Sequence, residues 1–293
     1  MDMIFSPKQP YSLTSVIRSH GWIQLIPFEN QNDYQTFAYT MQLSDDKVIR
    51  FEAYEKNGEI CVTVPDSLTE SELTEIRKAV TWMLAMDIDL SEFYKAAADE
   101  PHLQKAIEKS AGRILRSHTL FEDVLKTILT TNTLWAATKS MNRKLVELYG
   151  APLAENPAIH AFPTPSTLAN VSEDEIKEKI RVGYRAPFIH ELAVRISNGS
   201  LDVEALRSST LSTAELKKEF QKLKGIGPYA AAHLLMLMGR YDFIPIDSWA
   251  LKMVSLEWHN GGPIKPIDVE KAFEKWGQFK GLAYWMWEWT NNP

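Results

Sequence analysis

The chain has 293 residues, of which 45% are hydrophobic, and this is enough for two domains or one large one around a substantial core. Its single cysteine, Cys61, excludes an internal disulfide and a four-cysteine iron–sulfur cluster, and the sequence has no HExxH motif or Cys/His array that would indicate a zinc site. The net charge of −6 excludes a strongly basic nucleic-acid-binding domain over the whole chain.

The charge is distributed unevenly. Residues 1–100 contain 17 acidic and 8 basic side chains, a net charge of −9, whereas residues 101–293 contain 21 and 24, a net charge of +3. The start, MDMIFSPKQP, lacks the basic and long apolar regions of a signal peptide, and no stretch reaches membrane-spanning length. We therefore expect a cytoplasmic protein with no membrane partner. Any nucleic-acid binding by the mildly basic part should be steeply salt-sensitive.

The first hundred residues predict an antiparallel sheet followed by a helix. Polar turns such as Lys56-Asn57-Gly58 separate short segments rich in Ile, Val, Phe and Tyr. The predicted strands are residues 22–27, 34–43, 47–54 and 59–64. Residues 69–86 then predict a helix, because Thr69 can cap its first turn and Glu72 can complete a capping box.

From about Ser91 onward the sequence predicts helix almost throughout. The predicted breaks are residues 150–165, Gly183, Gly199 and residues 262–263. The fold class expected is therefore α+β. We place an N-terminal antiparallel sheet plus helix domain at residues 1–95 and a mostly α-helical body at residues 96–293.

The most informative motif is the segment LKGIGPYA at residues 223–230. An amphipathic helix is predicted before it, over residues 214–223, and an alanine- and leucine-rich helix after it. Gly225 and Gly227 tolerate backbone angles forbidden to other residues and have no Cβ to keep a phosphate at a distance. Pro228 suits the first helical position. A glycine turn before a helix N-terminus presents free amides and a positive dipole end, which indicates an anion site such as a DNA phosphate.

The structural alternative is a tight turn between two core helices, which often contains glycine. A lone carboxylate, Asp247, lies twenty residues after Gly227 in the loop at residues 244–248 and favours a chemical role. Its own structural alternative is the N-cap of a helix over residues 248–257. The two roles are compatible, because a fixed carboxylate is what an electron-deficient sugar transition state needs nearby.

The hairpin, the small-residue helix after it and the Pro-x-Asp segment resemble the helix-hairpin-helix DNA glycosylase superfamily. Residues 116–150 and 160–188 extend the likeness, which is specific from about residue 95 to 290. The resemblance implies two helical subdomains with a cleft between them and damaged double-stranded DNA as the partner of a monomeric protein. It implies that Gly225 and Gly227 grip the DNA backbone while Asp247 stabilises positive charge on the deoxyribose. It leaves room for a structural monovalent cation at the hairpin carbonyls and implies no other cofactor.

The residue at position 229 bears on the subclass. Family members that also cleave the strand carry a lysine two residues after the second hairpin glycine, and this chain has Tyr229 there. A phenol cannot form a Schiff base, so we expect a monofunctional enzyme that uses water. Lys222 and Lys224 precede the glycines; for both we favour phosphate contact, with a solvated surface position as the alternative.

An aromatic residue at position 229 is similar to the bacterial 3-methyladenine glycosylase II type. Alkylation makes a purine cationic, so aromatic faces attract it. Four tryptophans lie between Trp276 and Trp289, and Trp249 follows the aspartate, although Trp285 and Trp289 have the spacing of an ordinary buried stripe. The expected base pocket comprises Tyr229, His233, Trp249 and Tyr284.

A second likeness points to 8-oxoguanine glycosylase. The run at residues 183–186, GYRA, resembles the loop in which tyrosine wedges into the stack and arginine reads the unpaired cytosine, which implies these roles for Tyr184 and Arg185. Asn132 matches an asparagine that also contacts the cytosine. Aromatic filling of a vacated stack and Arg or Asn contact with a base edge suit these residue types.

Other positions of that lesion pocket differ. Ala137 replaces a second arginine, His233 stands at a cysteine position, and Tyr284 stands where a glutamine recognises the base. We therefore expect a DNA glycosylase of base excision repair that acts on an alkylated purine, with Asp247 catalytic. The alternatives are an oxidised-purine glycosylase and a non-catalytic helix-hairpin-helix damage sensor.

Overall fold

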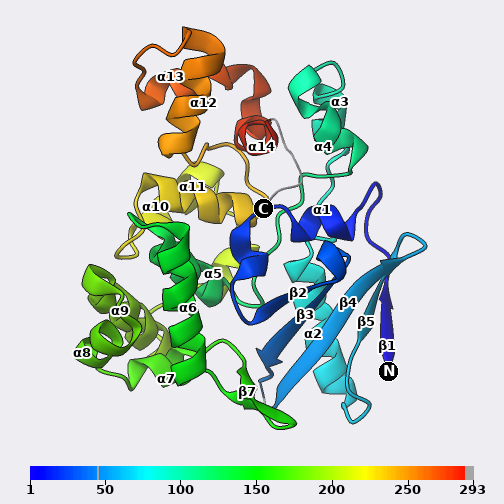
Figure 1. Ribbon diagram of the computed structural model, residues 1–293, viewed down its shortest axis with the longest axis vertical. Helices are drawn as coiled ribbons and strands as arrows, with labels where there is room; N and C mark the ends of the chain where they lie inside the picture. The colour runs from blue at the N-terminus through cyan, green and yellow to red at the C-terminus, as the bar shows by residue number, and fades with distance from the viewer. Residues whose placement is uncertain (45, 288–293) are drawn as a thin grey trace.

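An antiparallel sheet precedes a largely helical body, as the computed structural model, which describes residues 1–44 and 46–287, shows (Figure 1). The predicted α+β class is therefore confirmed. The sheet has five antiparallel strands in the order β1-β5-β4-β3-β2. The strands are β1 (Asp2–Phe5), β2 (Phe28–Gln31), β3 (Thr36–Gln42), β4 (Val48–Lys56) and β5 (Glu59–Thr63).

The predicted strands at residues 34–43, 47–54 and 59–64 are confirmed as β3, β4 and β5. Along β4, buried Ile49, Phe51 and Ala53 alternate with more exposed neighbours, as a sheet with one buried face requires. Asn57 and Gly58 close the β4–β5 hairpin with φ of 56° and 79°. Both angles lie in the left-handed region that two-residue hairpin turns need.

The prediction of a strand at residues 22–27 is wrong. Residues Gly21–Gln24 form a 3-10 turn, η1, and the strand β2 begins only at Phe28. Trp22 and Ile23 are consecutive and both buried, which a strand on a one-sided sheet cannot achieve. β1 and β2 were not predicted; each has only four residues.

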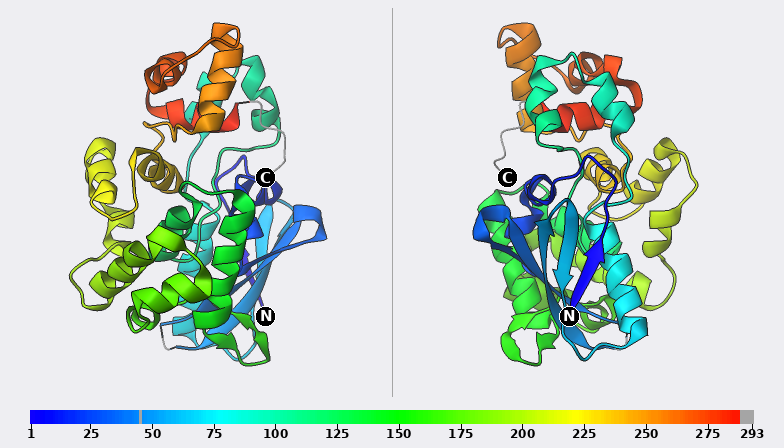
Figure 2. Two further views of the ribbon diagram at one scale, coloured as in Figure 1. Left: turned by 60° about the vertical axis from the view of Figure 1, so that its left-hand side comes forward. Right: turned by 90° about the vertical axis from the view of Figure 1, so that its right-hand side faces the viewer.

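The helix after the sheet, α2 (Glu70–Met83), has the predicted start. The Thr69 side chain accepts a hydrogen bond from the Glu72 amide, and the Glu72 carboxylate accepts one from the Thr69 amide. This reciprocal pairing is a capping box and satisfies two donors that a helix start otherwise leaves free. α2 lies along one face of the sheet (Figures 1 and 2).

The remaining helices confirm the helical body, apart from a small hairpin of β6 (Pro152–Leu153) and β7 (Asn156–His160) in the predicted break. α1 lies between β1 and β2 in the chain. The helices are α1 (Leu13–Ile17), α3 (Ser91–Ala96), α4 (Gln104–Glu108), α5 (Leu120–Thr130), α6 (Trp135–Tyr149), α7 (Pro165–Ala169), α8 (Glu173–Glu175), α9 (Ala186–Ser197), α10 (Thr213–Gln221), α11 (Pro228–Leu237), α12 (Ser248–His259), α13 (Pro266–Ala272) and α14 (Lys280–Met286).

The helical body has two groups of helices. α3 and α4 gather with α12, α13 and α14 at one end, α5 to α9 lie beside the sheet, and α10 and α11 lie between these groups (Figures 1 and 2). Phe93 packs against Phe279 with ring centroids 5.7 Å apart, and Lys275 forms an ion pair with Glu100 at 2.8 Å. Segments far apart in the sequence, residues 91–108 and 248–286, therefore build the first group. The predicted boundary between residues 95 and 96 falls inside α3.

None of the helices in residues 1–44 and 46–287 is long and apolar enough to cross a membrane. Trp289, part of the predicted tryptophan stripe, lies outside the described residues.

Candidate DNA-binding and catalytic site

The helix-hairpin-helix motif forms where it was predicted. α10 ends at Gln221 and α11 begins at Pro228, so residues 222–227 make the turn. Gly225 has φ of +87°, and a Cβ on it would lie 2.8 Å from Cδ2 of Phe188. Glycine is therefore required here by backbone angle and by space.

Gly227 differs from Gly225. It is the N-cap of α11 with φ of −85°, an angle that other residues adopt, and no heavy atom lies within 4 Å of the position a Cβ would take. That open space faces the cleft, since residues 225–230 all line it. The first turn of α11 thus presents its amides to an anion that can approach closely.

Asp247 and this hairpin line the same cleft, which has a volume of 1190 Å³. It is the N-cap of α12, and its Oδ1 accepts a hydrogen bond of 2.8 Å from the amide of Ala250. The same oxygen accepts a longer hydrogen bond of 3.4 Å from the hydroxyl of Tyr284. The structural alternative of an N-cap is therefore correct, and it fixes the carboxylate at the cleft wall.

The floor of the cleft is aromatic. Tyr229 and His233 have nearly parallel rings, 6.4 Å apart and inclined by 6°. Trp22 meets His233 at 5.2 Å and Trp285 meets it at 6.0 Å, and all four residues line the cleft, with Trp22 2% and His233 5% exposed. Burial lowers the pKa of His233 to about 4 and raises that of Tyr229 to about 12, so both are neutral at pH 7.

The N-terminal segment contributes residues that the sequence did not indicate. His20, Gly21, Trp22 and Gln24 line the cleft, and the rings of His20 and Trp22 lie next to His233 of α11. The Nε1 of Trp135 donates to Oε1 of Gln24 at 2.9 Å and joins this segment to α6. Because residues 22–27 have the composition of a strand, no local signal separates them from the sheet.

Asn132 and Tyr184 meet at the rim of the cleft. The Asn132 amide donates to the Tyr184 hydroxyl at 3.3 Å, and the hydroxyls of Thr131 and Tyr184 lie 3.5 Å apart. Tyr184 is 51% exposed, and Leu134, two residues after Asn132, is 80% exposed. Residues from α5–α6 and from the turn before α9 thus form one projecting surface.

Three of the predicted site residues lie elsewhere. Arg185 is buried and its guanidinium donates to the carbonyls of Thr131 and Val182, so it supports the rim from beneath. Trp249 is 60% exposed and does not line the cleft, because the second position of α12 faces solvent. Tyr284 lies behind Asp247 and does not line the cleft itself.

Lys224 lines the cleft and forms an ion pair with Glu191 of α9. Its side chain is 61% exposed, so it is accessible to a phosphate that would replace this carboxylate. Among residues 1–44 and 46–287, no cluster of three or more His, Cys, Asp or Glu side chains could hold a metal ion.

The fold and cleft together define a helix-hairpin-helix protein with a glycine turn and a fixed carboxylate in one cleft. Comparison with known proteins agrees with this class. The model of the HhH-GPD superfamily of base excision DNA repair proteins matches residues 125–279, more than half of the chain. The chain therefore belongs to the HhH-GPD superfamily.

Individual relatives are distant. The chain is 25% identical over 218 residues to a DNA-3-methyladenine glycosylase of Bacillus subtilis (strain 168), a match that covers 72% of this chain and 71% of the relative. A 3-methyladenine DNA glycosylase from Archaeoglobus fulgidus has a similar structure, with a TM-score of 0.77, 19% identity and 97% of each chain covered. An 8-oxoguanine glycosylase/lyase from Clostridium acetobutylicum has a TM-score of 0.69, 21% identity and 93% of each chain covered.

Proposed function

We propose that the protein is a monofunctional DNA glycosylase that flips a damaged, preferably alkylated, purine from duplex DNA and hydrolyses its N-glycosidic bond. The observation that carries this proposal is that Asp247, the hairpin turn at residues 225–230 and an aromatic floor all line one cleft. The anion site would position the DNA backbone and the aromatic floor would receive the base. The Asp247 carboxylate would then lie next to the sugar of the flipped nucleotide.

In the proposed mechanism, the hairpin amides bind phosphate beside the lesion and hold the strand in register. Tyr184 enters the stack that the flipped nucleotide leaves, and Asn132 contacts the opposite base. The base lies against Tyr229, Trp22 and Trp285. As the glycosidic bond lengthens, positive charge develops on the sugar and the Asp247 carboxylate stabilises it. Water then completes the hydrolysis at the sugar carbon.

The proposal includes the absence of lysine-dependent strand cleavage. Tyr229 occupies the position of the family's nucleophilic lysine, and a neutral phenol cannot form a Schiff base with the sugar. The nearby Lys224 lies outside the aromatic floor and pairs with Glu191. Cleavage of the strand should therefore require added alkali.

Alkylated purine is the preferred substrate because neutral aromatic rings attract a cationic base without opposing charge. The Bacillus subtilis relative, named a DNA-3-methyladenine glycosylase, supports this choice. An oxidised-purine glycosylase remains the second candidate. It is favoured by the contact between Asn132 and Tyr184, two residues that also carry the likeness to 8-oxoguanine glycosylase.

The test measures base release and strand cleavage separately. Duplexes containing 3-methyladenine, 1,N6-ethenoadenine or 8-oxoguanine opposite cytosine are incubated with the protein, and free base is quantified before and after alkali. We expect release of 3-methyladenine with strand breaks only after alkali. Asp247→Asn should lower the release rate by about 100-fold or more while the protein still binds DNA.

Four other outcomes would contradict part of the proposed function. Release of 8-oxoguanine alone would establish the second candidate, and strand breaks without alkali would contradict the monofunctional assignment. Binding with no release from any lesion would indicate a damage sensor. Equal rates for the wild type and Asp247→Asn would remove Asp247 from its catalytic role.

A further inference from the structure

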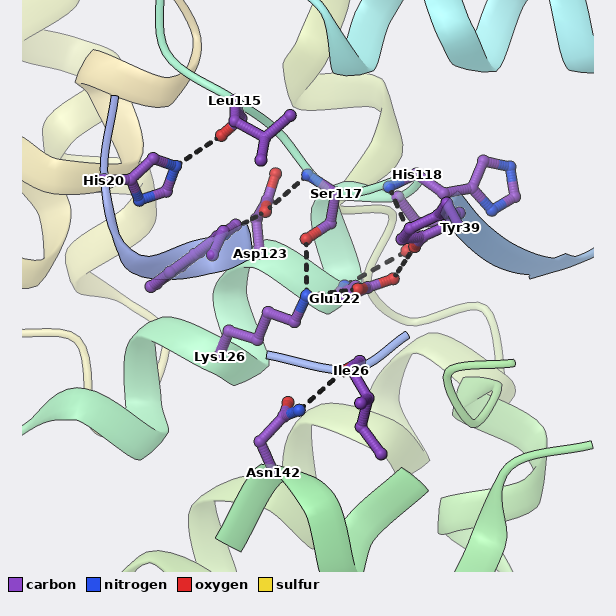
Figure 3. Close-up of polar contacts among 12 residues, drawn as sticks. His20, Ile26, Tyr39, Leu115, Ser117, His118, Glu122, Asp123, Lys126 and Asn142 are labelled. Atoms are coloured by element: carbon purple, nitrogen blue, oxygen red, sulfur yellow. Dashed lines mark hydrogen bonds and ion pairs between the residues drawn. The ribbon is translucent and has the colours of Figure 1, made fainter. Parts of the chain in front are cut away.

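A fully buried carboxylate lies directly behind the aromatic floor. Asp123 of α5 accepts a hydrogen bond of 2.8 Å from Nε1 of Trp22 and one of 3.0 Å from the amide of Ser117, both on Oδ1. Its side chain is 0% exposed, and its other oxygen, Oδ2, has no hydrogen-bond partner. Figure 3 shows Asp123 within a cluster of polar side chains between the sheet and the helical body.

The neighbouring charges leave Asp123 as the surplus anion. Lys126 and Glu122 of the same helix form a buried ion pair at 2.6 Å, and Tyr39 of β3 donates to Glu122 at 2.6 Å (Figure 3). The charge of Lys126 is therefore matched by Glu122. Arg116, the other cation facing this region, pairs with the Asp87 carboxylate at 3.9 Å and donates to the carbonyls of Leu237 and Trp82.

No positive charge on the cleft floor offsets this anion. His20 lies 4.7 Å from Trp22 and 5.8 Å from His233, ring centroid to ring centroid. Burial lowers the pKa of His20 to about 3, and that of His233 to about 4. His20 places Nε2 2.6 Å from the Leu115 carbonyl, so the neutral ring carries its proton there.

An amide at position 123 would satisfy the same two donors at lower cost. Burial of a carboxylate with one oxygen unbonded is unfavourable by several kcal/mol, whereas a neutral acceptor avoids most of that penalty. The hydrogen bond that holds Trp22 in place could be accepted equally well by a neutral side chain, so it does not explain the negative charge of Asp123. A charge on the N–H side of an indole does, however, increase the electron density of the ring that faces the cleft.

We propose that Asp123 is a positioning and specificity-determining residue, which holds Trp22 against the base and makes the cleft floor selective for cationic, alkylated purines over neutral damaged bases. This inference rests on the proposed glycosylase function and names the substrate class of the same site. Asp123 acts through Trp22 and does not touch the base.

The test compares one cationic and one neutral lesion. Asp123→Asn keeps the acceptor for Trp22 and Ser117 but removes the charge. We expect kcat/KM for 3-methyladenine to fall about tenfold relative to that for 1,N6-ethenoadenine, equivalent to about 1.4 kcal/mol. Trp22→Phe should lower the same ratio. In the Trp22→Phe background, Asp123→Asn should lower it little further, because the indole through which Asp123 acts on the base is absent. Trp82→Phe is the matched control. Trp82 lies beneath the Arg116 guanidinium and does not line the cleft, so this substitution should leave the ratio unchanged.

The pH profile of the ratio separates charge from packing. Burial raises the pKa of Asp123 to about 6, although hydrogen bonds from Ser117 and Trp22 oppose the shift. Lys126, Arg116 and Tyr39 are the other ionisable groups that face it. In the wild type the preference for 3-methyladenine should fall as the pH drops through about 6, and in Asp123→Asn it should be flat.

Two results would overturn the inference. One is an unchanged ratio in folded Asp123→Asn; the other is an equal loss for both lesions, which would indicate a packing role only. Failure of the wild type to release any base would instead reject the glycosylase function, so the two failures are distinguishable. Circular dichroism of each variant checks that the fold is retained.

Discussion

At the level of single residues, the Asp247 side chain caps a helix and lines the cleft at the same time. Its Oδ1 caps α12 by accepting from Ala250, and this bond prevents the carboxylate from rotating away from the cleft. Tyr284 donates to the same oxygen from behind. Burial, together with the charge of Asp247, raises the pKa of Tyr284 well above its usual range, so the phenol stays protonated and remains a donor. The position of the carboxylate therefore depends on a helix start and on one buried phenol.

Removal of that phenol should affect catalysis more than folding. Tyr284→Phe deletes one donor to Asp247, and we expect kcat for base release to fall roughly two- to tenfold with KM little changed, because one hydrogen bond contributes about 0.5–1.5 kcal/mol. Tyr94→Phe is the matched control, since the Tyr94 hydroxyl donates to the Ala111 carbonyl at 2.7 Å away from the cleft. Equal effects of the two substitutions on kcat would contradict the role given to Tyr284.

At the scale of elements, the hairpin assigns different tasks to its two glycines. Gly225 lets the chain turn, because its φ of +87° and the nearby Phe188 ring exclude a side chain. Gly227 leaves space for a ligand, because its backbone is ordinary and nothing protein-derived occupies the position of a Cβ. From the sequence motif alone, both glycines are predicted to have the same two roles, in the turn and at the phosphate.

Alanine at each glycine should separate folding from binding. Gly225→Ala should lower the free energy of unfolding by about 1–3 kcal/mol, since it introduces backbone strain and a contact with Phe188. Gly227→Ala should leave Tm nearly unchanged yet weaken DNA binding about tenfold, which is about 1.4 kcal/mol, because its methyl group takes the space of a phosphate. Thermal unfolding and fluorescence anisotropy with duplex DNA measure the two effects. A large loss of Tm in Gly227→Ala would contradict the division of tasks.

At the scale of the whole molecule, the sheet and the helical body share one buried polar interface. Tyr39 of β3 bonds to Glu122, and Trp22 of the N-terminal segment bonds to Asp123, so both contacts converge on α5. The cleft floor is completed by the same N-terminal segment. The N-terminal part of the chain, despite its acidic composition, therefore forms part of the candidate site.

This interface should make stability depend on pH. His20 and His233 have folded pKa values of about 3 and about 4, below the unfolded value of 6.5, so their contribution is complete above pH 6.5 and is lost as the pH falls toward 4. The raised pKa of Asp123 acts in the opposite direction between about pH 6 and pH 4. The two histidines outweigh it, and from these three groups we expect about 3 kcal/mol less stability at pH 4.5 than at pH 7.

Urea unfolding at the two pH values measures this difference. His20→Asn, whose amide can still donate to the Leu115 carbonyl, should reduce the loss on acidification, because one of the two titrating rings is gone. Stability that rises from pH 7 to pH 4.5 would show that these buried rings are not neutral in the folded state.

The sequence by itself determined the α+β class, β3 to β5, the capping box of α2, the hairpin and the N-cap position of Asp247. These features depend on local patterns: alternation of apolar residues, glycine and proline chemistry, and the polar residue that precedes a helix. The HhH-GPD membership, matched over residues 125–279, was likewise indicated by these motifs.

Only the tertiary structure decided which side chains reach the cleft. It brought His20 and Trp22 to the floor from a segment that resembles a strand, directed Trp249 toward solvent and placed Arg185 beneath the rim. It also revealed Asp123, which in sequence is an ordinary residue of an amphipathic helix. The physical reason is that direction and burial depend on packing between segments about a hundred residues apart, and no local pattern records that packing.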